Sequence, residues 1–172
     1  MLLTLIGYRA TGKTTLAKLL AGRLDCDWSD ADVEIERRAG KTIAEIFAED
    51  GEAVFRDLEA EVIVDLCRRD SLVLATGGGA PMREESRRAM HEGGKVVCLT
   101  AEPETVLARL NADATTAERR PDLTDRDPLE EILFLIEKRE PVYRHLADLV
   151  VDTEGKSPDD LVTEILDRLD LV

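Results

Sequence analysis

The stretch GYRATGKTT, residues 7–15, constrains the fold of this chain more than any other part of the sequence. Four residues carry the pattern G-x-x-x-x-G-K-[ST] of a phosphate-binding loop: Gly7, Gly12, Lys13 and Thr14. An apolar run suited to a buried strand, residues 2–6, precedes the loop, and a segment with helical periodicity, residues 14–24, follows it. Strand, loop and helix in that order are the context that the motif requires, so the sequence predicts an α/β fold.

Several positions of this loop have a physical role toward a nucleotide. Glycine lets the backbone curl so that successive N–H groups point at the β-phosphate, and the N-terminus of the following helix adds its positive dipole. The Lys13 ammonium can bridge the β- and γ-phosphates, and the Thr14 hydroxyl can ligate Mg²⁺. A chance glycine-rich turn is the alternative, but such a turn does not need a strand before it and a helix after it.

Apolar runs and helical segments alternate along the rest of the chain. Strands are predicted at residues 2–6, around 26–28, and at 72–76, 95–99 and 148–152. Helices are predicted at residues 14–24, 33–50, 53–69, 83–92, 102–111, 128–146 and 158–169. A chain of 172 residues with this alternation predicts a single domain, residues 1–172, in which helices cover both faces of a parallel sheet. Ligands of such sheets bind beyond the carboxyl ends of the strands.

One segment, residues 111–128, departs from the alternation. It is polar, contains two prolines and three arginines, and lacks a continuous apolar face. We expect a mobile lid at about residues 111–127, because phosphotransfer enzymes use such elements to exclude water. Arg120 lies in this segment and could swing onto the transferring phosphoryl group.

Composition narrows the partners and the surroundings of the protein. The net charge of -14 repels phosphate backbones and anionic lipids, so we expect no nucleic acid and no membrane as partner. No apolar run approaches the roughly 18 residues of a membrane span, and the opening residues lack the features of a signal peptide, so a cytoplasmic protein is expected. The cysteines number three and form no C-x-x-C pair, which predicts reduced core thiols rather than disulfides or a zinc site.

The stretch WSDADVEIE, residues 28–36, places two carboxylates after the second predicted strand. On an extended segment, the spacing of Asp30 and Asp32 aims both side chains the same way. If this strand lies beside the phosphate-binding loop, one carboxylate can face a magnesium shell and the other an incoming hydroxyl group. The alternative is that one aspartate only caps the helix predicted to begin near Val33. Trp28, the only tryptophan, is expected to pack in the core.

Glycines and arginines elsewhere suggest a site for a small anion. Three consecutive glycines in TGGGAP, residues 76–81, are costly in backbone entropy unless the chain needs positive φ or a ligand comes close. Arg56 and Arg139 lie on predicted helices. A lone helical arginine usually forms a surface ion pair, whereas two that converge can grip a carboxylate.

Taken in order, these motifs resemble those of the shikimate kinases over nearly the whole chain. The matching stretches are GYRATGKTT, DADVEIE, IAEIFAEDGEAVFRDLE, TGGGA, RRPDLT, KREPVYR and VVDT. Gluconate kinases and nucleoside monophosphate kinases share the first of these but not the series D-x-D, F-R-x-x-E and G-G-G. The chain departs from the commonest pattern at Ala31, where many members of the family have threonine, and we expect little effect from this change.

The resemblance implies a fold and a reaction. Shikimate kinases have a five-stranded parallel sheet flanked by helices, are usually monomers, and transfer the γ-phosphate of ATP to the 3-hydroxyl of shikimate. Their product feeds the synthesis of chorismate and aromatic amino acids. The partners implied are therefore ATP and shikimate, with Mg²⁺ as the cofactor.

The resemblance also implies roles for individual residues. Those that cradle the phosphates are Ala10, Thr11, Gly12, Lys13, Thr14 and Thr15. Those around the adenine are Arg109, Lys156 and Pro158, while Arg120 closes over the phosphates. The magnesium residues are Thr14 and, through water, Asp30. The shikimate residues are Asp32, Arg56, Gly78, Gly79 and Arg139, of which Asp32 also takes the proton of the hydroxyl. Asp32, Lys13 and Arg120 are thus the expected catalytic residues.

Two alternatives stay open from the sequence. The first is another small-molecule kinase, such as a gluconate kinase, that uses the same loop on a different alcohol. The second is a nucleotide-binding module without catalysis. The chain has no counterpart of the guanine-reading N-K-x-D motif of GTPases, and the presence of Lys13, Thr14, Asp30, Asp32 and Arg120 together favours catalysis.

Overall fold

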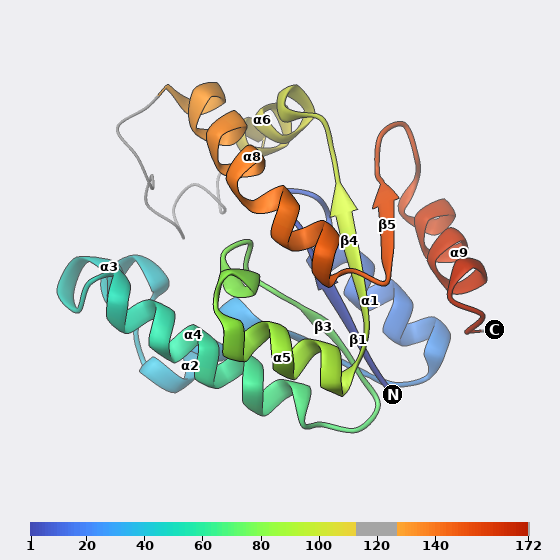
Figure 1. The fold of residues 1–172 in the computed structure, drawn as a ribbon, viewed down its shortest axis with the longest axis horizontal. Coiled ribbons are helices and arrows are strands. Elements are labelled where there is room, and N and C mark those ends of the chain that lie inside the picture. The colour runs from blue at the N-terminus through green and yellow to red at the C-terminus, as the bar shows by residue number, and fades with distance from the viewer. Residues whose placement is uncertain (113–126, 172) are drawn as a thin grey trace.

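The computed structural model of the chain describes residues 1–112 and 127–171. A five-stranded sheet with the order β2-β3-β1-β4-β5 forms its centre, and every neighbouring pair of strands is parallel. The strands are β1 (Leu2–Ile6), β2 (Asp27–Asp30), β3 (Leu72–Ala75), β4 (Gly94–Thr100) and β5 (Leu149–Asp152). Helices flank the sheet (Figure 1), so the α/β fold and the five strands predicted from the sequence are confirmed.

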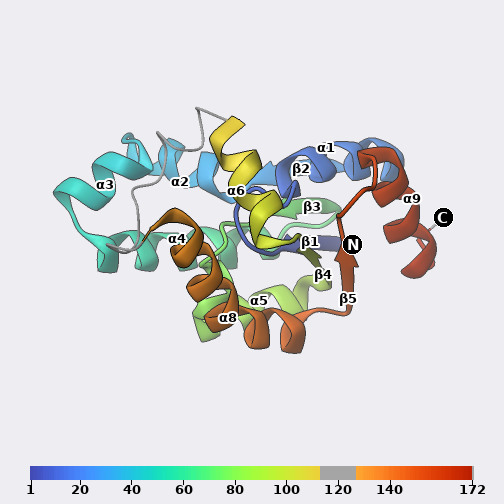
Figure 2. The ribbon, with the colours of Figure 1, turned by 90° about the horizontal axis from the view of Figure 1, so that it is seen from above.

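The helices form two layers around the sheet. Those that the structure describes are α1 (Lys13–Leu24), α2 (Ala31–Ala39), α3 (Ile43–Glu49), α4 (Glu52–Cys67), α5 (Glu84–Gly93), α6 (Pro103–Ala112), α8 (Pro128–Leu146) and α9 (Pro158–Arg168), with a 3-10 turn, η1 (Ala80–Met82). Figure 2 looks along the sheet and shows α1 and α9 on one face and α5 and α8 on the other. Helices α2, α3 and α4 pack together to one side of the sheet (Figure 1), and α4 also packs against α5.

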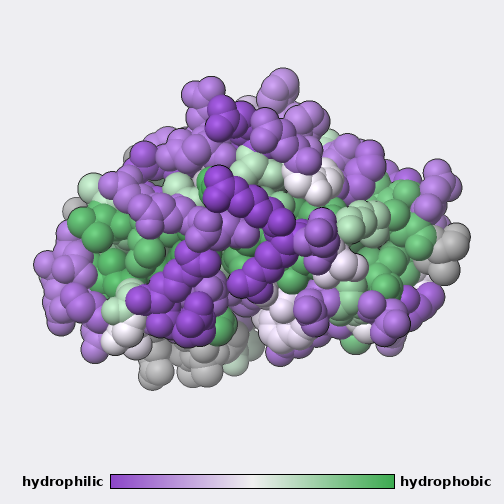
Figure 3. Space-filling view, turned by 90° about the horizontal axis from the view of Figure 1, so that it is seen from below, coloured by the Kyte–Doolittle hydropathy of each residue, from purple (hydrophilic) through white to green (hydrophobic). Residues whose placement is uncertain are grey.

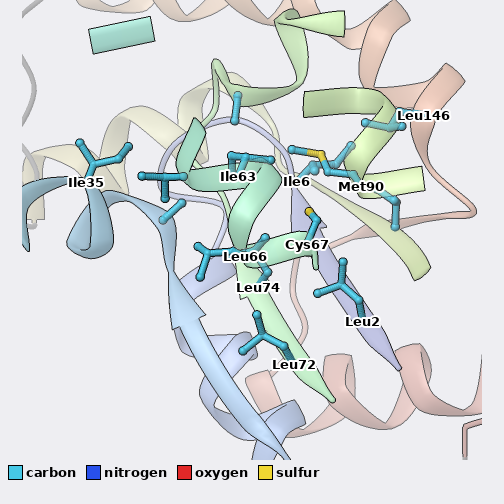
Figure 4. Close-up of a cluster of buried hydrophobic side chains, with 14 of the residues drawn as sticks. Leu2, Ile6, Ile35, Ile63, Leu66, Cys67, Leu72, Leu74, Met90 and Leu146 are labelled. Carbon is cyan, nitrogen blue, oxygen red and sulfur yellow. The ribbon is translucent and has the colours of Figure 1, made fainter. Parts of the chain in front are cut away.

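The alternation of side chains along the strands builds a core on each face of the sheet. In β1, Leu3 and Leu5 pack toward α1 and α9, whereas Leu2 and Ile6 pack toward α4 and α5. Figure 4 shows the second of these clusters, which contains Met90 of α5 together with Leu2 and Ile6. All residues of β1 are buried, as expected for a central strand of a parallel sheet covered on both faces.

The single helix predicted over residues 33–50 is wrong, because the structure has two helices there. Gly40 ends α2 in the left-handed conformation with φ 65°. Thr42 then begins α3 with a capping box, since its side chain accepts a hydrogen bond from the backbone of Glu45 and the Glu45 carboxylate accepts one from the backbone of Thr42. Both the glycine and the T-x-x-E spacing are readable in the sequence, and together they mark the break.

The expectation for Trp28 is also wrong. Its side chain is 40% exposed, and the Lys18 ammonium lies 4.9 Å from the centroid of the indole ring. Strand β2 is an edge strand that pairs only with β3 among the described strands, so its side chains are less covered than those of β1. The predicted core thiols are confirmed for Cys67 and Cys98, whereas Cys26 is only partly buried.

The strands end together at one edge of the sheet. Asp30 of β2 and Leu5 of β1 both lie level with Ala75 of β3. The segments that follow these three strands therefore meet, and Figure 2 looks down on this edge. Figure 3 shows the opposite side, where the strands begin: hydrophilic side chains cross its middle and hydrophobic ones lie on both sides of them. Within the described ranges, no helix is long and apolar enough to cross a membrane.

Candidate nucleotide and acceptor site

The loop between β1 and α1 is held in a fixed curl. Gly7 has φ 134°, and a Cβ at this position would lie 2.3 Å from the carbonyl oxygen of Leu99 on β4, so only glycine fits. Ala10 adopts φ 60°, and the Thr11 hydroxyl donates a 2.8 Å hydrogen bond to the carbonyl of Tyr8. Helix α1 begins at Lys13, directly after the loop. The loop thus has the shape and the helix N-terminus that favour phosphate binding.

The Lys13 side chain lies over the same loop. Its Nζ donates hydrogen bonds to the carbonyl oxygens of Gly7, at 2.9 Å, and Tyr8, at 2.6 Å, and the residue is buried. The ammonium group thereby places a positive charge inside the curl of the loop. Thr14 and Thr15, in the first turn of α1, are exposed on the surface.

Arg109 of α6 reaches the loop from the side. Its Nη1 donates to the Ala10 carbonyl at 3.1 Å and to the Thr153 hydroxyl, which follows β5, at 3.4 Å. The structure thus brings Arg109 to the phosphate loop, as expected of a nucleotide residue. The segment after Thr153 leads to Lys156, whose Nζ lies 2.6 Å from the Glu164 carboxylate, and to Pro158, the first residue of α9.

Asp30 and Thr14 come together at the carboxyl edge. The Thr14 hydroxyl donates a 2.6 Å hydrogen bond to Oδ2 of Asp30, while Oδ1 of Asp30 accepts one from the backbone N–H of Asp32 at 2.9 Å. Asp30 therefore faces Thr14 and also caps α2, so the capping role is confirmed, while the magnesium role of Asp30 and the hydroxyl role of Asp32 stay predictions. A hydroxyl and a carboxylate form the kind of oxygen pair that binds Mg²⁺ together with substrate phosphates and water.

One expectation for this stretch is wrong, and it concerns Asp32. Although β3 lies between β2 and β1, the end of β2 still lies next to the first turn of α1, where Thr14 contacts Asp30. Asp32 is not on an extended segment but in the first turn of α2, where it is partly buried. Within the described parts of the chain, no group of three or more histidine, cysteine or acidic side chains is placed to hold a metal by itself.

The glycine loop after β3 brings the two predicted arginines together. A Cβ at Gly78 would lie 3.3 Å from Nη1 of Arg139, and one at Gly79 would lie 2.2 Å from Nη1 of Arg56. Consecutive Cα atoms are only about 3.8 Å apart, so both guanidinium groups lie against neighbouring residues of one short loop. A Cβ at Gly78 would also lie 3.5 Å from the carbonyl oxygen of Gly7, so the glycine loop packs directly on the phosphate loop.

Acidic partners hold Arg56 in this position. Its Nη1 lies 2.7 Å from Oε2 of Glu59, whose side chain is only 1% exposed, and its Nε lies 3.5 Å from Glu52. The sequence reasoning assigned no role to Glu59, although R-x-x-E spacing places both residues on one face of a helix. A second buried carboxylate, Glu131 of α8, accepts a 3.0 Å hydrogen bond from Arg9 of the phosphate loop. Glu131 has no comparable signal, because Arg9 is distant in the sequence.

The predicted lid lies mostly outside the described residues. Residues 111 and 112 belong to the end of α6, and residues 113–126, including Arg120, are not described. The lid and the role of Arg120 therefore stay predictions.

The fold and the site together define a class. A parallel sheet with a G-x-x-x-x-G-K-[ST] loop after its central β1, and with polar residues gathered at the carboxyl edge beside that loop, is the architecture of the P-loop kinases that act on small molecules. Within that class the chain belongs to the shikimate kinase family, whose model matches residues 9–170.

Individual relatives agree with the family model. The chain is 48% identical to a shikimate kinase of Rhodopirellula baltica over 95% of its own length and 88% of that protein. It is 45% identical to a shikimate kinase of Pseudomonas fluorescens over 97% and 95%. Among solved structures, shikimate kinase of Acinetobacter baumannii in complex with shikimate superposes with a TM-score of 0.91 at 36% identity, covering 98% of this chain and 92% of that one.

A gluconokinase structure shares the fold alone. The enzyme of Sinorhizobium meliloti superposes with a TM-score of 0.60, at 12% identity, over 98% of this chain and 90% of that chain.

Proposed function

We propose that this protein transfers the γ-phosphate of ATP to the 3-hydroxyl of shikimate, giving shikimate 3-phosphate for chorismate and aromatic amino-acid synthesis. Family membership supports an ATP-dependent kinase. One observation of the structure supports shikimate as the acceptor. Two guanidinium groups, of Arg56 and Arg139, converge on consecutive glycines that pack against the phosphate loop. This arrangement suits a small molecule with a carboxylate at one end and a hydroxyl near the γ-phosphate. The protein is proposed to work in the cytoplasm and as a monomer.

On the nucleotide side, the residues from Ala10 to Thr15 would cradle the phosphates, with the Lys13 ammonium on the β- and γ-phosphates. Arg109, Lys156 and Pro158 would lie around the adenine. Thr14 and Asp30 would hold Mg²⁺, which neutralises charge on the phosphates when bound. The 2.6 Å contact between their oxygens supports this pairing. Arg120 would add a positive charge over the transferring group.

On the acceptor side, the two arginines and the backbone at Gly78 and Gly79 would hold shikimate. Asp32 would bind its hydroxyls and take the proton of the 3-hydroxyl as the bond to phosphorus forms. The loose transition state of phosphoryl transfer asks mainly for positioning and charge neutralisation, so a carboxylate of ordinary basicity suffices.

The alternatives have weaker support. A gluconate kinase would have the same fold, but the gluconokinase likeness is at 12% identity and carries the fold alone. A module without catalysis would not need Thr14, Asp30 and Asp32 at one edge beside two converging arginines.

The first experiment measures ADP release from ATP and Mg²⁺ with shikimate, gluconate, AMP or no acceptor in parallel, each with and without EDTA. We expect release that requires both shikimate and free Mg²⁺. Release with gluconate or AMP instead of shikimate would keep the phosphate loop but overturn the assignments of Asp32, Arg56 and Arg139. Release that persists in excess EDTA would overturn the magnesium assignment alone.

The glycine loop offers a sharper test of the acceptor site. We expect Gly79→Ala to raise the KM for shikimate about tenfold or more, because the new methyl group must displace the guanidinium of Arg56. The KM for ATP should stay within about twofold of the parental value, because the lost hydrogen bond of Arg56 serves the acceptor and not the nucleotide. Steady-state kinetics with each substrate varied separately measures both values. Gly22→Ala on α1 is the control, because no described atom outside the neighbouring backbone of its own helix would lie within 4 Å of the new methyl group. Equal rises in both KM values would argue against the role of Arg56.

A further inference from the structure

Tyr143 is a buried tyrosine that contacts the glycine loop of the proposed acceptor site. Its side chain is on α8, four residues after Arg139, so both side chains project from the same face of one helix. The residue is 4% exposed, and its hydroxyl donates a 2.5 Å hydrogen bond to the carbonyl oxygen of Gly78. The bond joins α8 to the glycine loop across 65 residues of sequence.

Arg139 lies near the same phenol. Burial raises the pKa of Tyr143 to about 12, although the positive charge of Arg139 opposes this rise. The phenol is therefore protonated at neutral pH and has one proton to donate. That proton goes to the Gly78 carbonyl.

This chain of contacts fixes two groups that the proposed function places on the substrate. Gly78 lies between the guanidinium of Arg139 and the Gly7 carbonyl of the phosphate loop. A shift of the Gly78 backbone would move the acceptor relative to the phosphates, and a rotation of Arg139 would break bidentate geometry on a carboxylate. The Tyr143 hydroxyl holds the Gly78 backbone, against which Arg139 lies.

We propose that Tyr143 is a positioning residue for the acceptor: its hydroxyl holds the Gly78 carbonyl beside the Arg139 guanidinium and thereby presets the pocket for the carboxylate of shikimate. The inference rests on the proposed function, because it takes Arg139 and the glycine loop as the acceptor site. Tyr143 itself does not need to touch the substrate. Its replacement therefore affects acceptor binding through Arg139 and leaves the nucleotide side intact.

The test is Tyr143→Phe, which keeps the ring and removes only the hydroxyl. We expect the Kd and KM for shikimate to rise about tenfold, because the Gly78 carbonyl loses its donor and the backbone beside Arg139 can shift. The KM for ATP should stay within about twofold, and kcat within about threefold. Shikimate titration calorimetry and two-substrate kinetics measure these values. Ser86→Ala is the control, since its hydroxyl is equally buried on α5 and has no hydrogen-bond partner among the described residues.

A double-mutant cycle with Arg139→Lys distinguishes positioning from a general loss of structure. If Tyr143 acts through Arg139, Tyr143→Phe should weaken shikimate binding less in the Arg139→Lys background than in the parent. Full additivity, unchanged shikimate affinity, or parallel losses for shikimate and ATP would each overturn the proposal. A parent protein without shikimate-dependent ADP release would instead overturn the proposed function itself.

Discussion

Replacing Asp32 by asparagine will lower kcat for shikimate phosphorylation by about three orders of magnitude, while ATP binding stays nearly intact. Asparagine has the same shape and can still bind hydroxyls, but it cannot take the proton of the attacking hydroxyl. The first turn of α2 is otherwise preserved, because Asp30 caps the helix through the backbone N–H of residue 32. Turnover is measured with saturating shikimate and ATP, and nucleotide affinity by calorimetric titration.

Asp27→Asn is the matched control for this variant. Asp27 is an exposed aspartate on β2, three residues before Asp30, and its replacement should leave both values at the parental level. Turnover of Asp32→Asn equal to that of the parent would remove Asp32 from the catalytic residues. The proton would then leave through another group or directly to water, which the loose transition state permits.

The sequence predicts the layout of the fold well because the strongest signals are local. The apolar run at residues 2–6 reads as a buried strand, and the structure buries every residue of β1. The predicted helix at residues 128–146 has the bounds of α8, since Asp127 caps it and Pro128 occupies its first turn. The glycine and arginine motifs also fall at the same edge of the sheet, because parallel strands end together there.

The features that the sequence did not predict depend on distant partners. No local feature of β2 indicates that it is an edge strand separated from β1 by β3. The exposure of Trp28 and the direct hydrogen bond between Thr14 and Asp30 could therefore not be predicted from the sequence. The break between α2 and α3 could have been predicted, because Gly40 and the Thr42 capping box are local signals. The single helix was predicted from hydrophobic periodicity without weighing these two signals. The bond from Tyr143 to Gly78 joins segments 65 residues apart and has no local signal.

The buried cations explain how so acidic a protein can admit an anionic substrate. Its net charge is -14, yet many of the ion pairs among the described residues lie on the surface, where solvent screens them. Arg139, at 8% exposure, and the half-buried Arg56 lie in less solvated surroundings, where an opposite charge interacts more strongly. If the acceptor binds at the glycine loop as proposed, we therefore expect the local field there, rather than the total charge of the protein, to govern its binding.

Replacing Arg139 by alanine is expected to weaken shikimate binding by about 100-fold or more, because a bidentate pair of charge-assisted hydrogen bonds is lost. The affinity for ATP should change by less than about threefold, because the lost hydrogen bonds serve the acceptor alone. Calorimetric titration of each ligand measures both. Arg144→Ala is the matched control: it removes the same side chain from the same helix, but Arg144 is 59% exposed and pairs only with Glu140 in the described part of the chain.

Comparing the loss of shikimate affinity between variants also ranks the residues of the proposed acceptor site by their contribution to binding. Arg139→Ala removes the charge itself, whereas Tyr143→Phe removes only the group that orients it, so the first loss should exceed the second by about tenfold. Comparable losses from both variants would mean that orientation, rather than charge, dominates acceptor binding. Unchanged shikimate affinity in Arg139→Ala would exclude Arg139 from the acceptor site and leave the half-buried Arg56 as the guanidinium proposed to bind the carboxylate.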